Sequence, residues 1–132
     1  IMLVELGAND GLRGIDPAEV RSNLSAILER LTAEGIPTLL AGMYAPPNFG
    51  PAYSEAFDSI YPELAEEYDV HLYPFFLDGV AAEPSLNQPD GIHPNAEGVR
   101  VIVQNILPAV ITVLEDAGLA ERAQSAAEGD AP

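Results

Sequence analysis

Three short apolar stretches alternate with amphipathic stretches along the chain, and this order constrains the fold more than any other feature. Residues 1–6, 36–43 and 70–76 are rich in aliphatic and aromatic side chains, and each is flanked by Gly or Asp on at least one side. Such runs are typical of buried strands. The alternation of strand and helix predicts right-handed βαβ units on a parallel sheet. We therefore expect an α/β fold.

The first helix carries signals at both ends. Asp16 is a typical N-cap residue, Pro17 suits the first helical position, and Glu19 completes the start signal. Gly35 suits the position just after a helix C-terminus. A helix is therefore predicted between Asp16 and Gly35, joining the first strand to the second.

Two later helices each contain a proline. One is expected from about residue 53 to residue 67, with a kink or break at Pro62, because proline lacks the N–H that a helix interior needs. The other opens at Pro94 and is expected to be divided at Pro108. Residues 120–132 lack an apolar stripe and predict a flexible tail, so residues 1–119 are expected to form the C-terminal part of a single domain.

Composition excludes several classes of function. The chain has 21 acidic and 5 basic residues and a formal net charge of −16, whereas nucleic-acid binding needs a cationic surface. The absence of cysteine excludes disulfides, a thiol nucleophile and cysteine-based zinc sites. Polar residues or prolines interrupt every apolar run before the roughly 18 residues of a membrane span. Neither a nucleic-acid partner nor a membrane span is expected.

The stretch at residues 87–95 is the best candidate for catalytic chemistry. Asp90 and His93 stand three residues apart in a loop rich in Pro and Gly. In a bent loop the carboxylate can accept a hydrogen bond from Nδ1, which leaves Nε2 free to take a proton from a hydroxyl nucleophile. The alternative is a turn in which Asp90 caps the backbone and His93 lies on the surface. His71, in the third strand, has no carboxylate at such spacing and is expected to be structural.

A second motif follows the first strand. Gly7, Asn9 and Asp10 form a Gly-x-Asn-Asp turn that would present the amide of Asn9 at the carboxyl end of the strand. A turn residue that tolerates a left-handed backbone is the alternative for Asn9. Leu-Gly-Ala-Asn-Asp-Gly-Leu-Arg-Gly at residues 6–14 and Asp-Gly-Ile-His-Pro-Asn at residues 90–95 resemble two signature blocks of the SGNH (GDSL) hydrolase family. The likeness is close to its thioesterase I, lysophospholipase L1 and arylesterase branch.

The resemblance implies a fold and a set of roles. The fold is a three-layer, flavodoxin-like parallel sheet of about five strands flanked by helices. His93 is then the general base, Asp90 orients it, and Asn9 together with Gly7 forms part of the oxyanion hole. The loops at residues 11–15, 44–52 and 77–89 would line an acyl pocket, with Leu12, Ile15 and Asn48 as substrate-binding residues.

The sequence departs from the family pattern at the nucleophile. The family's serine lies in an amino-terminal Gly-Asp-Ser-Leu block, and a second block supplies a glycine oxyanion donor; neither occurs in the 132 residues. We therefore expect the first strands and the nucleophile to lie on an N-terminal segment or a companion chain. The serines present are Ser22, Ser25, Ser54, Ser59, Ser85 and Ser125, of which the first four fall on predicted helices.

The resemblance implies a serine hydrolase of short to medium acyl esters or thioesters that needs no cofactor. A carbohydrate O-acetyl esterase of the same family, and a catalytically inert fragment or interaction module, are the alternatives. No loop shows the dense oxygen-ligand spacing of a calcium site, so no metal is expected. A periplasmic or secreted location is suggested by the family resemblance alone.

Overall fold

The computed structural model describes residues 1–119, and three parallel strands form its centre. The strands β1 (Met2–Glu5), β2 (Thr38–Ala41) and β3 (His71–Tyr73) lie in the order β1-β2-β3. Each strand is shorter than its apolar run, and β3 ends just before Pro74, which has no N–H for the ladder. The expected α/β fold with a parallel sheet is confirmed.

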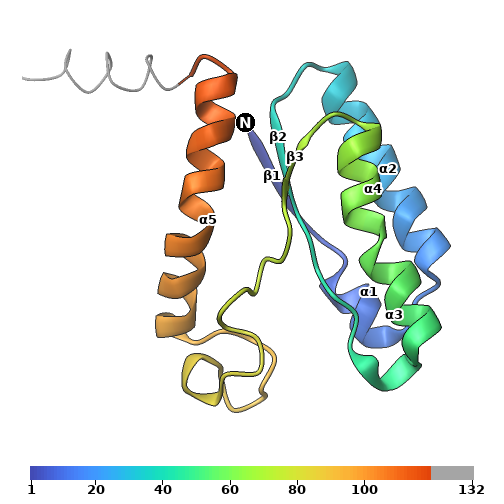
Figure 1. The fold of residues 1–132 in the computed structure, drawn as a ribbon, viewed down its shortest axis with the longest axis vertical. Helices are drawn as coiled ribbons and strands as arrows, with labels where there is room; N and C mark the ends of the chain where they lie inside the picture. The colour runs from blue at the N-terminus through green and yellow to red at the C-terminus, as the bar shows by residue number, and fades with distance from the viewer. Residues whose placement is uncertain (120–132) are drawn as a thin grey trace, which may run out of the picture.

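Helices cover both faces of this sheet, which makes three layers (Figure 1). One face carries α2 (Pro17–Ala33), α3 (Pro51–Asp58) and α4 (Ile60–Glu67). The other face carries α5 (Ala96–Asp116), which packs against β2 and β3. The expected tail at residues 120–132 lies outside the described residues.

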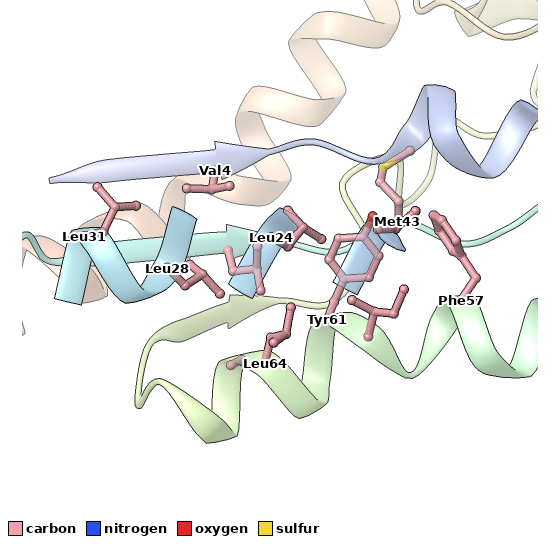
Figure 2. Packing of buried hydrophobic residues seen from close by; sticks show 12 residues of the cluster. Val4, Leu24, Leu28, Leu31, Met43, Phe57, Tyr61 and Leu64 are labelled. Carbon is pink, nitrogen blue, oxygen red and sulfur yellow. The ribbon is translucent and has the colours of Figure 1, made fainter. Parts of the chain in front are cut away.

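The main core lies between β1, β2 and the first group of helices. Figure 2 shows apolar side chains of α2 meeting those of α4 beneath the sheet. Each buried aliphatic side chain of this kind contributes about 1.5–3 kcal/mol relative to an exposed one. The cluster therefore fixes the position of β1 and of the turn that follows it. Its fully enclosed members include Leu28, Leu40, Phe57, Ile60, Tyr61 and Leu64.

The break expected from Pro62 is present, three residues upstream of that proline. Ser59 separates α3 from α4, so that Pro62 becomes the third residue of α4. The first-turn N–H groups of a helix have no partner within it, and the missing N–H of Pro62 therefore removes no hydrogen bond.

The expectation that Pro108 divides the last helix is wrong. The helix α5 runs without interruption from Ala96 to Asp116. Pro108 lies on the solvent side, where the loss of one helical hydrogen bond is tolerated. Ile106 and Val113, on either side of it, are both buried in a second cluster with Leu39 of β2, and this contact holds the two halves of the helix in line.

The helix α5 is, within residues 1–119, the one helix long and apolar enough to cross a membrane by length and composition. One side of it packs on the sheet. Its other side leaves an apolar stripe uncovered, made up of Val99, Val103, Leu107 and Ile111. That this chain has no membrane span stays a prediction.

Candidate active site

A glycine turn after β1 places Asn9. Gly7 adopts φ = 102°, a left-handed conformation that side chains other than glycine's rarely allow, and leads into the short helix α1 (Ala8–Arg13). The buried Tyr61 hydroxyl donates a hydrogen bond to the Leu6 carbonyl at 3.0 Å, and a Cβ on residue 7 would collide with that hydroxyl. Gly7 thus lets the turn lie against Tyr61, which sets Asn9 in the first turn of α1. Burial is the main cause that raises the pKa of Tyr61.

The helix α1 replaces part of the loop expected at residues 11–15. It has six residues and is enclosed by two glycines, Gly7 and Gly14, both in left-handed conformations. Gly14 ends the helix with its N–H directed to the carbonyls of Asp10 and Gly11. The Gly-rich motif predicted a single turn. The structure instead has a turn at Gly7, the short helix α1 and a second turn at Gly14.

Asp90 and His93 form a hydrogen-bonded pair in the loop before α5. Asp90 Oδ2 lies 2.8 Å from His93 Nδ1, while Oδ1 accepts backbone N–H groups from Ile92 and His93 at 3.0 Å each. The carboxylate therefore caps the turn and also holds the imidazole, while the catalytic role of the pair stays a prediction. With Nδ1 engaged, Nε2 is the nitrogen left for proton transfer.

These hydrogen bonds set the charge of the pair. The His93 side chain, followed by the backbone N–H groups of His93 and Ile92, lowers the pKa of Asp90 to about 2. The carboxylate is therefore ionised throughout the neutral range, as an orienting group must be. Both side chains are accessible, with 44% of Asp90 and 64% of His93 exposed.

Side-chain amides brace the loop that carries this pair. Asn87 Nδ2 donates to the carbonyls of Val80 and Glu83, at 2.7 and 2.8 Å. Asn95 caps the start of α5 through Oδ1, and its Nδ2 donates to the Ser85 carbonyl at 2.9 Å. A segment with little regular structure is thus fixed at both of its ends.

Asn9 and His93 line one cavity of 550 Å³ at the carboxyl ends of the three strands. Most of its remaining lining is apolar and comes from the segments that follow β1, β2 and β3. Leu12, expected to bind substrate, is part of this lining. The largest apolar side chains in the lining are Leu12, Met43, Tyr44, Phe75, Phe76, Leu77 and Ile92.

Four residues expected at the site lie outside the lining of this cavity, and one of them, Asp90, is linked to it through the hydrogen bond to His93. Gly7 borders a second, smaller cavity together with residues of α2. Ile15 packs against the main core, and its carbonyl accepts the Tyr53 hydroxyl at 2.8 Å. Asn48 is exposed in the one-turn helix η1 (Pro47–Phe49). Substrate contact by Ile15 and Asn48 stays a prediction.

Glu5 is a further residue of the cavity lining that neither sequence motif indicated. Its half-buried side chain ends β1 and lines the same cavity as Asn9 and His93. Burial raises the pKa of this carboxyl. The signal was available in the sequence, because Glu5 is the one charged residue in an otherwise apolar strand.

No serine lines the cavity among residues 1–119. Ser59 lies at the junction of α3 and α4 and not inside a helix, and Ser85, in the one-turn helix η2 (Pro84–Leu86), donates to Glu83. The helices α2 and α3 hold Ser22, Ser25 and Ser54, whereas Ser125 falls outside the described residues.

The part of the chain that the structure describes contains no group of three or more His, Asp or Glu residues placed to hold a metal ion. The second histidine, His71, lies 3.3 Å from Asp116 at the end of α5. This carboxylate partner is distant in sequence, which is why no motif spacing indicated it. The pair joins β3 to α5 and does not line the cavity.

Because of its hydrogen bond to His93, the Asp90 carboxyl should titrate at an unusually low pH. A lowered pKa means that the fold favours the ionised carboxylate, so the bond stabilises the fold above pH 3.8 and loses its effect as the pH falls through about 2. In a carboxyl carbon NMR titration, Asp90 should titrate near pH 2, and His93→Ala should raise its midpoint. His71→Ala is the matched control and should leave Asp90 unchanged. A midpoint at the ordinary value in the unmodified protein would contradict this geometry.

Comparisons with known proteins agree with the fold and the motifs. The profile of the GDSL-like Lipase/Acylhydrolase family matches residues 1–101. Esterase TesA of Pseudomonas aeruginosa is 40% identical over 114 residues, which cover 86% of this chain and 57% of the relative. Thioesterase 1/protease 1/lysophospholipase L1 of Escherichia coli K12 is 48% identical over 96 residues, which cover 73% and 46%.

A solved structure extends the likeness to three dimensions. A crystal structure of TesA superposes with a TM-score of 0.79 at 41% identity and covers 85% of this chain and 62% of its own. The chain spans about half the length of the curated relatives it matches. Its sequence blocks, its parallel three-layer fold and these relatives agree: the chain belongs to the GDSL-like lipase/acylhydrolase family, which confirms the resemblance to the SGNH hydrolases.

Proposed function

We propose that this chain supplies the general base, its orienting acid and one oxyanion donor of a serine esterase. One observation carries the proposal: Asn9 and His93, whose imidazole is paired with Asp90, line the same cavity although they are far apart in sequence. A cavity at the carboxyl ends of parallel strands is the usual place for a site in such a fold. Family membership supports hydrolysis of carboxylic esters.

The geometry suits acyl transfer to a serine. His93 Nε2 takes the proton of the serine hydroxyl as that oxygen attacks the carbonyl carbon, and Asp90 stabilises the imidazolium that forms. The Asn9 amide donates to the oxyanion of the tetrahedral intermediate, a contact worth about 3 kcal/mol in comparable enzymes. The imidazolium then returns the proton to the departing alcohol or thiol. Water attacks the acyl-serine by the same steps and releases the carboxylic acid.

We propose that the nucleophilic serine belongs to polypeptide outside these 132 residues, on a preceding segment or a companion chain. Two observations support this. No serine among residues 1–119 lines the cavity. In addition, within the described part of the chain β1 pairs only with β2, and the side chains of Met2 and Leu3 in this edge strand are exposed. A further parallel strand beside β1 would cover this edge, and its carboxyl end would reach the cavity.

Covalent labelling locates the nucleophile. The natural gene product that contains residues 1–132 is treated with a fluorophosphonate, which reacts with an activated serine, and the labelled peptide is identified by mass spectrometry. We expect one labelled serine outside residues 1–132. Labelling at Ser22, Ser54 or any other serine of this chain would refute the proposed origin of the nucleophile. No labelling and no hydrolysis would favour the inert fragment.

Two variants test the roles in the same protein. His93→Ala removes the base and should abolish hydrolysis of p-nitrophenyl butyrate, while Asn9→Ala removes an oxyanion donor and should lower kcat about a hundredfold or more. His71→Ala removes the other histidine, which bonds Asp116 outside the cavity, and should retain activity. Circular dichroism checks that each variant folds. Undiminished turnover by a folded His93→Ala variant would end the esterase proposal.

The lining of the cavity favours a neutral substrate with an apolar acyl group. Its one acidic side chain is Glu5, and the chain as a whole carries a net charge of −16. A polyanionic thioester such as butyryl-CoA meets unfavourable electrostatics there, and an apolar wall offers few hydrogen bonds to a sugar. We expect kcat/KM to be highest for p-nitrophenyl butyrate, lower for butyryl-CoA and lowest for acetylated xylan. A preference for xylan would identify the carbohydrate O-acetyl esterase instead.

A further inference from the structure

Two aromatic rings form a continuous piece of the cavity wall. Tyr44, just after β2, stacks on Phe75, just after β3, with ring centroids 4.6 Å apart and an interplanar angle of 29°. Both line the cavity that holds Asn9 and His93. Tyr44 is 52% exposed, whereas Phe75 is partly buried. The stack thus reaches from the mouth of the cavity into its interior.

Backbone hydrogen bonds make the base of this stack rigid. The Gly42 N–H donates to the Tyr73 carbonyl and the Phe76 N–H donates to the Gly42 carbonyl, each at 2.8 Å, so the two segments that carry the rings are tied together. The Ala45 N–H donates to Asp58 of α3 at 2.8 Å. The rings therefore form a fixed wall, not a loop that adapts to each substrate.

Phe75 and α1 follow the two outer strands of the sheet. In the strand order β1-β2-β3, α1 follows the first strand and Phe75 follows the third, so Leu12 and Phe75 come from opposite ends of the row, while Tyr44 follows the central strand. The part of the cavity between them is bordered by carbon-rich side chains. An acyl chain placed there would bury apolar surface on both sides.

We propose that the Tyr44–Phe75 stack binds the acyl chain and limits its length. This inference rests on the proposed esterase function and goes beyond it by naming the residues that set acyl specificity. Each methylene buried against the wall is expected to raise kcat/KM up to about fourfold. The gain stops where the chain meets the rings. Removing one ring should therefore admit longer chains.

Chain-length profiles test this in the natural gene product. The ratio of kcat/KM for p-nitrophenyl octanoate to that for p-nitrophenyl butyrate should rise about tenfold in Tyr44→Ala, because additional methylenes can occupy the vacated space. Tyr44→Phe keeps the stack and should keep the original ratio. Phe49→Ala is the matched control: its ring is 42% exposed in the neighbouring η1 but does not line the cavity, so the ratio should not change. An unchanged ratio in Tyr44→Ala, or an equal rise in Tyr44→Phe, would overturn the proposal.

A second measurement separates this proposal from the esterase function. Titration with 1-octanol, a neutral apolar probe, is followed by the NMR signals of the Tyr44 and Phe75 ring protons. Shifts in both rings, reduced for Phe75 in Tyr44→Ala, support the wall as an apolar-chain site even if no ester is hydrolysed. Absence of such shifts overturns it even if hydrolysis and its loss in His93→Ala are both observed.

Discussion

The parallel pairing of the three strands is the constraint on which the site depends. Because β1, β2 and β3 run in the same direction, their carboxyl ends meet at one edge of the sheet. Asn9, Tyr44 and Phe75 follow these ends and therefore border one cavity, although they are far apart in sequence. The core beneath β1 holds this arrangement through apolar contact with α2 and α4 (Figure 2). The chemistry of the site thus rests on ordinary packing.

Hydrogen bonds from buried or loop side chains then fix the individual residues that border the cavity. The Tyr61 hydroxyl fixes the turn that presents Asn9, and Asp58 fixes the start of the segment after β2. Asp90 uses both carboxylate oxygens, one for its own turn and one for His93. A hydrogen bond of this kind contributes only about 1 kcal/mol to stability. Its larger effect is on geometry, because a base or donor displaced by an ångström loses much of its effect.

Among the described residues, exposed apolar side chains occur in β1 and along the outer stripe of α5. The helices α2, α3 and α4 cover the first face of the sheet (Figure 1). A further strand beside β1, as proposed above, would cover the first of these two exposed regions. An exposed apolar patch of this kind marks an interaction surface in many proteins.

Much of this protein was determined by its sequence alone. Strand and helix periodicity predicted the α/β order, and the two sequence blocks predicted the family, because both signals are local in the chain. The sequence could not decide the course of the chain through Pro108, where buried neighbours override a local helix breaker, nor the partner of His71, which comes from a distant helix. Phe75, which the sequence places in a strand, became part of the cavity lining only through tertiary structure. The lining of a cavity comes from residues that are distant in sequence and close in space, so their spacing along the chain does not reveal it.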